Sequence, residues 1–303
     1  MESVVVTGSS GFVGASLCRE LIEEGYDVIG IDKQPPLFEH PPQLQTDIVD
    51  LTTSPDLPVA DIVVHLAAHS QVQPIVNKTD LAMENMEMTR HVLFEASQND
   101  AFVVNASSRE IYGAAIRPLE NEVSLDSPNG YAASKVACEA LANSYRHTQH
   151  LRVTSLRLSN VYGPMDTNRR VIPTFIALAN HGETLQVFGG EKVLDFVHVQ
   201  DVCDAILATI RREPVTDGMS LNIGSGVASS LTRVASIVAE EIEVCPGWEF
   251  GPDRIGDVDT YVTNLSNAVA ILDFNASVHL EEGLRQTIEW YQARPELLKE
   301  LVN

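Results

Sequence analysis

The sequence predicts an α/β protein: a Rossmann-type, doubly wound parallel sheet with a smaller C-terminal substrate-binding part. Continuous apolar runs such as SVVVTG and ADIVVHLAA alternate with long helical segments, as in parallel sheets that helices cover on both faces. A glycine-rich turn follows the first run, and the alternation becomes irregular after about residue 160. We expect residues 1–160 to form the first domain, residues 194–224 to return to it, and residues 161–303 to form the second part.

The elements follow one another as strand, helix and strand. The first strand ends at Gly8, and the helix after it places its apolar residues near one stripe and stops at Gly25. In the first half we expect strands at 3–8, 26–32, 60–68, 101–108 and 151–160, with helices at 11–25, 81–98 and 131–148. In the second half we expect a loop, a helix and a short strand over 161–190, a strand and a helix over 194–210, a short strand at 221–226, and helices at 229–242 and 280–292.

Length and charge restrict the classes of function. The chain has 303 residues, 44% of them apolar, which is ample for a globular core. Its formal net charge is −22, from 42 acidic and 20 basic residues, which argues against nucleic acid and anionic membranes as partners. Only five of the basic residues are lysines. Because salt screens the repulsion among like charges, an acid-rich, lysine-poor surface favours a halophilic protein over a merely acidic mesophilic one.

The sequence carries no signal for a membrane or a secretory route. No apolar stretch reaches the roughly 20 residues that span a bilayer, and no secretory signal is visible at the N-terminus. The four cysteines are scattered without a CxxC pair, so we expect reduced thiols in a cytoplasmic protein. We expect no metal site.

The segment TGSSGFVG is a glycine-rich turn between the first strand and the first helix. Glycines at such a turn let the backbone approach a pyrophosphate, which the free N–H groups of the helix N-terminus bind. Gly8, Gly11 and Gly14 have GxxGxxG spacing instead of the common GxGxxG, so the triplet alone is weak evidence. Asp32 ends the second strand, where a carboxylate accepts from the adenosine ribose and repels a 2′-phosphate. We therefore predict NAD as the cofactor, with NADP as the alternative because of Lys33.

The segment YAASK places Tyr131 and Lys135 four residues apart, on one face of a helix. A lysine ammonium near a phenol favours the phenolate. Such a tyrosine can take a proton from an alcohol while NAD takes the hydride. Ser108, at the end of the preceding strand, can hydrogen-bond the same hydroxyl. The YxxxK pattern alone is common by chance, and it gains meaning from the glycine-rich turn before it.

Together these motifs resemble the extended short-chain dehydrogenase/reductase superfamily, and within it the NAD-dependent nucleotide-sugar epimerase/dehydratase family. The resemblance covers nearly the whole chain, and it is specific to the family but poorly specific within it. It is carried by TGSSGFVG, Asp32, DIVD at 47–50, HLAA at 65–68, SSREIYG at 107–113, YAASK at 131–135, RLSNVYGP at 157–164, DFVHVQDV at 195–202, NIGSG at 222–226 and PDRIGD at 252–257.

The resemblance implies a role for each matching residue. Tyr131 would be the acid/base, Lys135 would orient the nicotinamide ribose, and Ser108 would share the sugar hydroxyl. Asn160 and Arg254 would hold the diphosphate of the sugar nucleotide. The other implied contacts are Gly8, Gly11, Phe12, Val13, Gly14, Asp32, Lys33, Asp47, Ile48, Leu66, Ala67, Ala68 and Ser107 for the cofactor, and Val187 and Phe188 for the nucleotide base.

Two positions depart from the family pattern. The resemblance implies an arginine in many relatives where this chain has Leu194, so one phosphate contact is expected to be missing, with Arg169, Arg170 or no residue in compensation. The usual glycine of the NxxGT motif is Met88 here. His69, just after the LAA turn, is a candidate substrate contact.

The two positions after Ser108 separate the reactions of the family. The resemblance implies two small residues there in most 4-epimerases, Asp and Glu in 4,6-dehydratases, and Glu at the second position in decarboxylases. This chain has Arg109 and Glu110. Glu110 is available as a base or a substrate contact, whereas a guanidinium stays protonated and cannot serve as a proton donor. An Arg–Glu pair that braces the loop is equally compatible with the sequence.

The function we expect is NAD-dependent epimerisation of a nucleotide sugar, of the UDP-glucose/UDP-galactose type at C4, through a transient 4-keto intermediate. One alternative is a sugar-nucleotide dehydratase or a UDP-glucuronate decarboxylase that uses Glu110. Another is a non-catalytic, NAD-sensing regulator, against which the intact Ser108, Tyr131 and Lys135 argue.

The family resemblance also implies a homodimer. Its usual interface consists of the helices at about 80–99 and 131–149. Met83, Met86, Leu93 and Phe94 lie on the first helix and are compatible with this interface, or with burial against the chain's own sheet.

Overall fold

The main sheet has seven parallel strands. The structure, a computed structural model, describes residues 1–38, 40–188, 192–251 and 260–302. The chain builds one half of the sheet outward from β1 (Ser3–Thr7) and then crosses to β4 (Ile62–His65), so the strand order reverses between these two strands. Ligands of such sheets bind at the carboxyl ends of the strands beside this point. The predicted fold class is confirmed, with the strands in the spatial order β10 (Ser220–Ile223), β6 (Val153–Leu158), β5 (Phe102–Ser108), β4 (Ile62–His65), β1 (Ser3–Thr7), β2 (Asp27–Asp32) and β3 (Gln45–Ile48).

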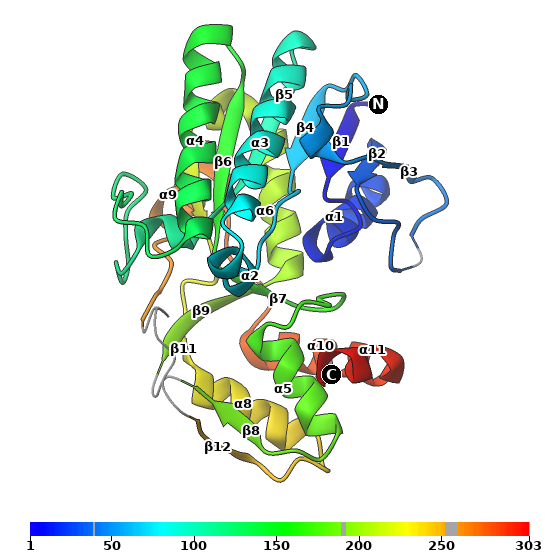
Figure 1. The fold of residues 1–303 in the computed structure, drawn as a ribbon, viewed down its shortest axis with the longest axis vertical. Helices are drawn as coiled ribbons and strands as arrows, with labels where there is room; N and C mark the ends of the chain where they lie inside the picture. Colours follow the sequence, from blue (N-terminus) through cyan, green and yellow to red (C-terminus); the bar gives the residue numbers. More distant parts are fainter. Residues whose placement is uncertain (39, 189–191, 252–259, 303) are drawn as a thin grey trace.

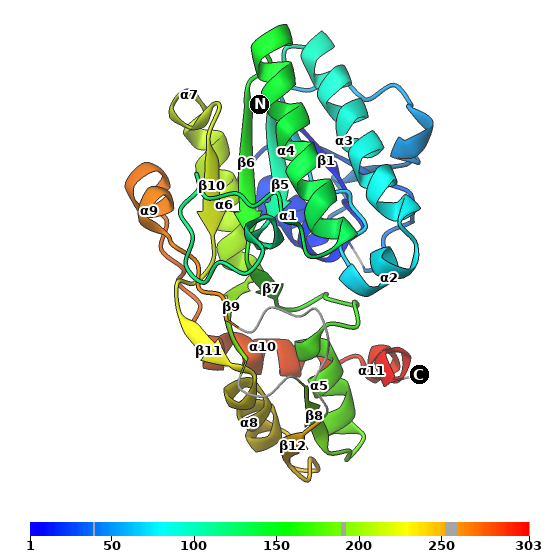
Figure 2. The ribbon, with the colours of Figure 1, turned by 60° about the vertical axis from the view of Figure 1, so that its left-hand side comes forward.

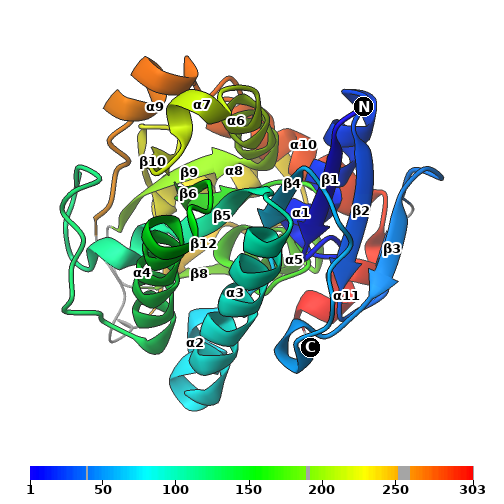
Figure 3. The ribbon, with the colours of Figure 1, turned by 90° about the horizontal axis from the view of Figure 1, so that it is seen from above.

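Helices cover both faces of this sheet, as Figure 3 shows. The pair α1 (Phe12–Glu23) and α6 (Val199–Arg211) packs on one face, and the pair α3 (Asp80–Gln98) and α4 (Gly130–Gln149) packs on the other. Successive residues of a strand point to opposite faces. Val4 of β1 therefore joins the core under α1, and Val5 joins the core under α3. This two-sided burial explains the continuous apolar runs of the sequence.

The C-terminal part lies below the carboxyl ends of the main sheet (Figures 1 and 2). It has its own apolar core, in which α5, α8 and α10 contribute Phe175, Val234 and Leu284. Its strands form a three-stranded and a two-stranded sheet. The elements are β7 (Asn160–Tyr162), β9 (Val193–His198) and β11 (Ala228–Ser230), then β8 (Leu185–Val187) and β12 (Trp248–Phe250), with helices α5 (Val171–Asn180), α8 (Leu231–Glu241), α10 (Leu280–Gln292) and α11 (Pro295–Val302).

Several short elements were not expected from the sequence. The segment after Ser108 is a turn of 3-10 helix, whose first N–H groups include that of Glu110, which donates to Ser108 Oγ at 3.2 Å. Short elements carry too few residues for a periodic pattern. Within the described ranges, no helix is both long and apolar enough to cross a membrane. The unexpected elements are β3, β7, β11, β12, α2 (Val72–Asn77), α7 (Glu213–Thr216), α9 (Ser266–Leu272), α11 and the 3-10 turns Leu51–Thr53 and Arg109–Tyr112.

Candidate active site

A cavity of about 900 Å³ lies between the carboxyl ends of the main sheet and the C-terminal part. Its walls are the turns after β1, β2, β4 and β5, the start of α4, and the loop that leads into α5. This is the position at which the strand order reverses. The predicted site residues that line it are Gly8, Gly11, Phe12, Val13, Gly14, Asp32, Lys33, Leu66, Ala67, Ala68, His69, Ser107, Ser108, Arg109, Glu110, Tyr131, Lys135, Asn160, Arg169, Arg170 and Phe188.

The glycine-rich turn brings backbone to the surface of the cavity. Gly8 has φ +76°, a conformation that favours glycine. A Cβ on Gly14 would lie 2.0 Å from the Gly8 carbonyl oxygen, so no side chain fits there. Gly11 caps α1 without a side-chain hydrogen bond, which leaves the first N–H groups of the helix open to an anion. These features fit the pyrophosphate of a dinucleotide.

Asp32 is held in place by the backbone on both sides of it. Its Oδ2 accepts from the N–H of Ser10 at 3.0 Å, and its Oδ1 accepts from the N–H of Gln34 at 3.0 Å. The carboxylate lies in the cavity wall and keeps lone pairs for the ribose hydroxyls of a cofactor. Lys33 also lines the cavity, but its side chain is exposed.

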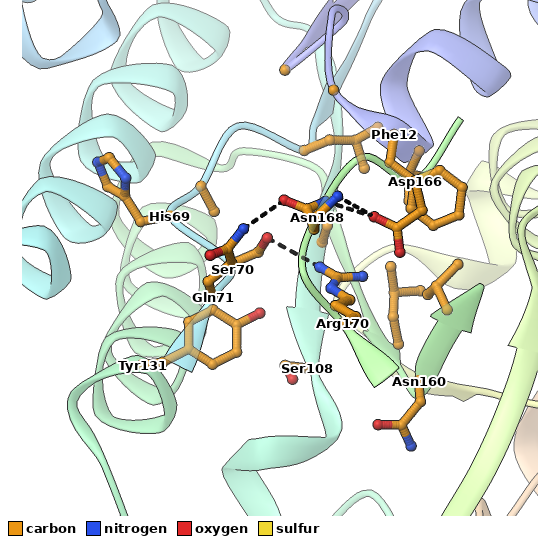
Figure 4. A pocket seen from close by; sticks show the side chains of 18 of the residues that line it. Phe12, His69, Ser70, Gln71, Ser108, Tyr131, Asn160, Asp166, Asn168 and Arg170 are labelled. Atoms are coloured by element: carbon orange, nitrogen blue, oxygen red, sulfur yellow. Dashed lines mark hydrogen bonds between the residues drawn. The ribbon is translucent and has the colours of Figure 1, made fainter. Parts of the chain in front are cut away.

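The three predicted catalytic side chains meet in the same wall. Ser108, Tyr131 and Lys135 are each more than nine-tenths buried. The ammonium of Lys135 donates to the carbonyl oxygen of Ala106 at 2.7 Å and lies 5.9 Å from the Tyr131 ring centroid. Asn129 caps α4 by accepting from the Ala132 N–H at 2.9 Å, which fixes the first turn of the helix. Figure 4 shows the hydroxyls of Ser108 and Tyr131 in the same part of the pocket.

Arg109 and Glu110 form an ion pair beside these residues. The Nη2 of Arg109 lies 2.9 Å from the Oε1 of Glu110, and the side chains are 12% and 13% exposed. The guanidinium also lies over the ring of Tyr261, 5.2 Å from its centroid. The Nη1 of Arg109 is buried without a hydrogen-bond partner. The bracing pair allowed by the sequence is thus present, and both residues still line the cavity.

The residues expected to bind the nucleotide base and diphosphate are only partly in the cavity. Val187 is fully buried in the core of the C-terminal part, so its side chain does not face the cavity, and its contact with the base stays a prediction. Side chains alternate along β8, and Gln186 and Phe188 face the cavity instead. Asn160 lines the cavity, although its amide nitrogen already donates to the Asp195 carbonyl oxygen at 2.8 Å. Arg254 lies outside the described residues.

The predicted adenine contacts Asp47 and Ile48 are not among the residues that line the cavity. Ile48 is 61% exposed at the edge of the sheet. The next residues along the chain, Val49, Asp50 and Leu51, line the cavity instead.

Residues from opposite walls meet across the cavity, and the sequence reasoning missed most of them. The Nη2 of Arg170 donates to Ser70 Oγ at 3.1 Å, and the Nε2 of Gln71 donates to Asn168 Oδ1 at 2.9 Å (Figure 4). Arg170 was a candidate for the missing phosphate contact, and it lines the cavity, where Figure 4 shows its guanidinium directed toward Ser70. The sequence signal for this part of the cavity was the pair of adjacent arginines, Arg169 and Arg170, in a strongly acidic chain.

His69 is among the residues that line the cavity, and its imidazole is engaged by a carboxylate. Its Nε2 lies 2.7 Å from the carboxylate of Glu84 on α3, and Figure 4 shows its ring turned away from the pocket. The imidazole thus already has Glu84 as a partner, and its contact with substrate stays a prediction. Among the described residues, no group of three or more His, Cys, Asp or Glu side chains could hold a metal ion.

The fold and the site define a class of protein: a Rossmann-type dinucleotide-binding protein with a buried tyrosine and lysine beside the cofactor turn. A model of the NAD dependent epimerase/dehydratase family matches residues 4–224, and the chain belongs to this family. Members of this family are enzymes, and NAD is the cofactor.

Curated relatives with different activities are about equally similar to the chain. It is 29% identical to the low-salt glycan biosynthesis protein Agl12 of Haloferax volcanii and 29% identical to a UDP-glucose 4-epimerase of Mycolicibacterium smegmatis, with 95% of this chain and 98% of each relative covered. It is 28% identical to a UDP-N-acetyl-alpha-D-glucosaminuronate decarboxylase of Bacillus cytotoxicus, over 95% of this chain and 97% of that one.

The solved structures that share the fold of this chain also include proteins with different reactions in their descriptions. The epimerase Mth375 of Methanothermobacter thermautotrophicus superposes with a TM-score of 0.92 at 26% identity, over 99% of this chain and 94% of that one. MoeE5 in complex with UDP-glucose and NAD superposes with a TM-score of 0.86 at 31% identity, over 96% and 99%. The hexosamine 5,6-dehydratase TunA reaches 0.87 at 27% identity, over 97% and 99%.

Proposed function

We propose that the protein is an NAD-dependent nucleotide-sugar epimerase that inverts C4 of a substrate of the UDP-glucose/UDP-galactose type. The observation that carries the proposal is the arrangement of Ser108, Tyr131 and Lys135, buried together in the wall of the cavity beside the glycine turn. Bound NAD supplies a reversible hydride acceptor. The glycine cradle and the anchored carboxylate of Asp32 fit this cofactor.

In the proposed reaction Tyr131 moves the proton and the neighbouring residues orient it. The Tyr131 oxygen takes the proton of the C4 hydroxyl as the C4–H hydride leaves, which gives a 4-keto sugar. Lys135, anchored on the Ala106 carbonyl, stabilises the phenolate by its positive charge. Ser108 donates a hydrogen bond to the C4 oxygen. After the sugar ring turns over, hydride returns to the other face and Tyr131 returns the proton to the oxygen, so atoms and electrons balance.

A positively charged side chain in the cavity, Arg170, supports recognition of an anionic sugar nucleotide. The chain carries a net charge of −22, so a diphosphate needs local positive charge. Arg170 lies in the pocket and is held by Ser70 at 3.1 Å, which supports it as the replacement for the arginine absent at Leu194. A guanidinium is well suited to phosphate oxygens, because it presents several N–H donors in one plane.

A lyase is the second candidate, because Glu110 lines the cavity. Decarboxylation of a 4-keto uronate needs no acid from the protein, whereas elimination of water needs a proton donor that Arg109 cannot supply. The engagement of Glu110 by Arg109 at 2.9 Å disfavours both lyase reactions, since the carboxylate already has a partner.

The test is to incubate the protein with UDP-glucose, UDP-galactose, their N-acetyl forms and UDP-glucuronate in deuterium oxide, and to identify the products by NMR. We expect the C4 epimer without deuterium at C5. A pentose product, or deuterium at C5, would overturn epimerisation in favour of a lyase. Binding of NAD without conversion of any sugar nucleotide would instead support the non-catalytic NAD-sensing alternative.

We further propose a homodimer through α3 and α4. Met83 and Phe94 of α3 are 62% and 43% exposed, which favours a partner surface there. Leu93 is 1% exposed and packs in the chain's own core, so it is not part of that surface. Light scattering should give twice the chain mass for the wild type and the single mass for a Met83→Glu/Phe94→Glu variant.

A further inference from the structure

A buried imidazole lies between the cofactor turns and the catalytic helix. His65, the last residue of β4, is 4% exposed. Its Nδ1 lies 2.8 Å from Thr7 Oγ1 on β1, and its Nε2 lies 3.1 Å from Thr89 Oγ1 on α3. Burial, together with the positive charge of Lys135, lowers the pKa of His65 to about 3. The ring is therefore neutral near pH 7 and carries a single N–H.

The partners of the two hydroxyls determine which nitrogen carries that proton. Thr89 has one hydroxyl proton, which it donates to the backbone carbonyl oxygen of Asn85 at 2.9 Å, with Cys138 Sγ at 3.1 Å as a second acceptor. Thr89 can therefore only accept from His65, which places the proton on Nε2. Thr7 then donates to Nδ1, while its oxygen accepts from the Ala67 N–H at 3.3 Å. In the opposite tautomer, the Thr7 proton would have no acceptor among the hydrogen bonds of the described residues.

One end of this chain of hydrogen bonds lies in the cavity wall that the turns after β1 and β4 form, where we expect the cofactor to bind. Ala67 lines the cavity, and its nitrogen would lie 2.8 Å from a Cβ on Gly8, so the turns after β1 and β4 are in close contact there. Thr7 directly precedes Gly8 and binds the Ala67 N–H. If a bound cofactor displaces either turn, we expect the hydrogen bonds that Thr7 makes with Ala67 and His65 to change.

The other end lies at the start of the catalytic helix. Asn85, 2% exposed, donates through Nδ2 to Ser134 Oγ at 3.2 Å. Ser134 in turn donates to the carbonyl oxygen of Tyr131 at 2.8 Å. Because Ser134 sits between Tyr131 and Lys135 in the sequence, this contact bears on the backbone that carries both side chains.

Asn85 also fixes the turn after β4. Its Oδ1 accepts from the His69 N–H at 2.7 Å, and its Nδ2 donates to the His69 carbonyl oxygen at 3.1 Å. The next two residues are Ser70 and Gln71, which reach across the cavity to the loop before α5 (Figure 4). The hydrogen-bond network therefore reaches three walls of the site. Both the oxygen and the nitrogen of the Asn85 side-chain amide have hydrogen-bond partners.

We propose that His65, as the Nε2–H tautomer, is a positioning residue that couples the cofactor turns to the backbone of Tyr131 and Lys135. The chain of contacts runs from Ala67 through Thr7, His65, Thr89 and Asn85 to Ser134. Each hydroxyl in it has one proton and at least one acceptor at hydrogen-bond distance, so displacement at one end changes the geometry at the other. The kinetic part of this inference rests on the proposed function, because it takes Tyr131 as the acid/base.

The first test needs no turnover. In protein labelled with ¹⁵N-histidine, with His65 assigned by its loss in His65→Gln, we expect the Nε2–H tautomer, unprotonated at Nδ1, from pH 5 to pH 8. Addition of NAD should shift the backbone amide signal of Ser134, which does not line the cavity. This shift should persist in Thr89→Ser and disappear in Thr89→Val, which has the same shape without the hydroxyl. An Nδ1–H tautomer, or the same NAD-induced shift in Thr89→Val, would overturn the inference whatever the reaction of the enzyme.

The second test separates positioning from packing by turnover. Thr89→Val should lower kcat by roughly tenfold or more, the scale on which small misplacements act, while the dissociation constant of NAD stays within about threefold. Thr89→Ser should restore turnover. The matched control is Thr209→Val on α6, because Thr209 is also buried and donates to the carbonyl four residues earlier, that of Ala205, at 2.8 Å. Equal losses of kcat in the two valine variants would show that Thr89 contributes only to packing.

Discussion

The guanidinium of Arg109 lies 2.9 Å from the carboxylate of Glu110, in the cavity wall that also holds Tyr131. The two residues follow Ser108 directly, where the family resemblance implies small side chains in most epimerases. The pair neutralises two charges that are only 12% and 13% exposed. A charge buried to this extent is costly without a hydrogen-bonding partner, so removal of either side chain should destabilise this wall of the cavity.

The first prediction concerns Glu110→Gln. If the carboxylate only braces Arg109, epimerisation should continue within about threefold of the wild type, because an amide oxygen still accepts a hydrogen bond from the guanidinium. The measurement is kcat by NMR with the best sugar nucleotide. Complete loss of product, with the fold intact by circular dichroism, would assign Glu110 to the chemistry.

The second prediction concerns Tyr131→Phe, which removes the proton acceptor and keeps the ring. Turnover should fall by at least about 100-fold, the low end of what a positioned acid–base group contributes. Binding of NAD should be little changed. The control is Tyr145→Phe on the same helix, because Tyr145 is not among the residues that line the cavity. Near-wild-type turnover of a folded Tyr131→Phe protein would contradict the assigned chemistry.

The third prediction concerns the cofactor. Calorimetric titration should give clearly tighter binding of NAD than of NADP, because the Asp32 carboxylate in the cavity repels a 2′-phosphate. Asp32→Ala should weaken the binding of NAD and reduce the difference in affinity between NAD and NADP. Since the same carboxylate accepts from the Ser10 and Gln34 N–H groups, the variant also loosens the glycine turn. Equal or tighter binding of NADP to the wild type would mean that the exposed Lys33 dominates.

The fourth prediction concerns salt. With a net charge of −22, the folded chain repels itself in dilute buffer, and about 1 M salt shortens the screening length to roughly 3 Å. The thermal midpoint should therefore rise as KCl increases from dilute to molar. Sucrose at matched osmolality is the control for general solute exclusion. A midpoint that does not respond to KCl would contradict the halophilic interpretation and leave the enzymatic one untouched.

Local patterns were sufficient for most of the architecture and for the centre of the site. The glycine turn, Asp32 at the end of β2 and the pair Tyr131–Lys135 are each defined within a few neighbouring residues. The carboxyl ends of parallel strands lie at one edge of the sheet, so the residues that follow these strands come together there. For this reason the fold class was confirmed, and these residues all line one cavity.

The sequence by itself therefore determined the fold class and the family, and it placed the cofactor turn beside a tyrosine and a lysine. Tertiary structure decided which of the remaining residues face the cavity. The contact between Ser70 and Arg170 joins residues 100 positions apart, and the orientation of Val187 into the core depends on which face of β8 the C-terminal helices cover. Such contacts depend on how separate elements pack, whereas a sequence pattern records only the spacing within one element.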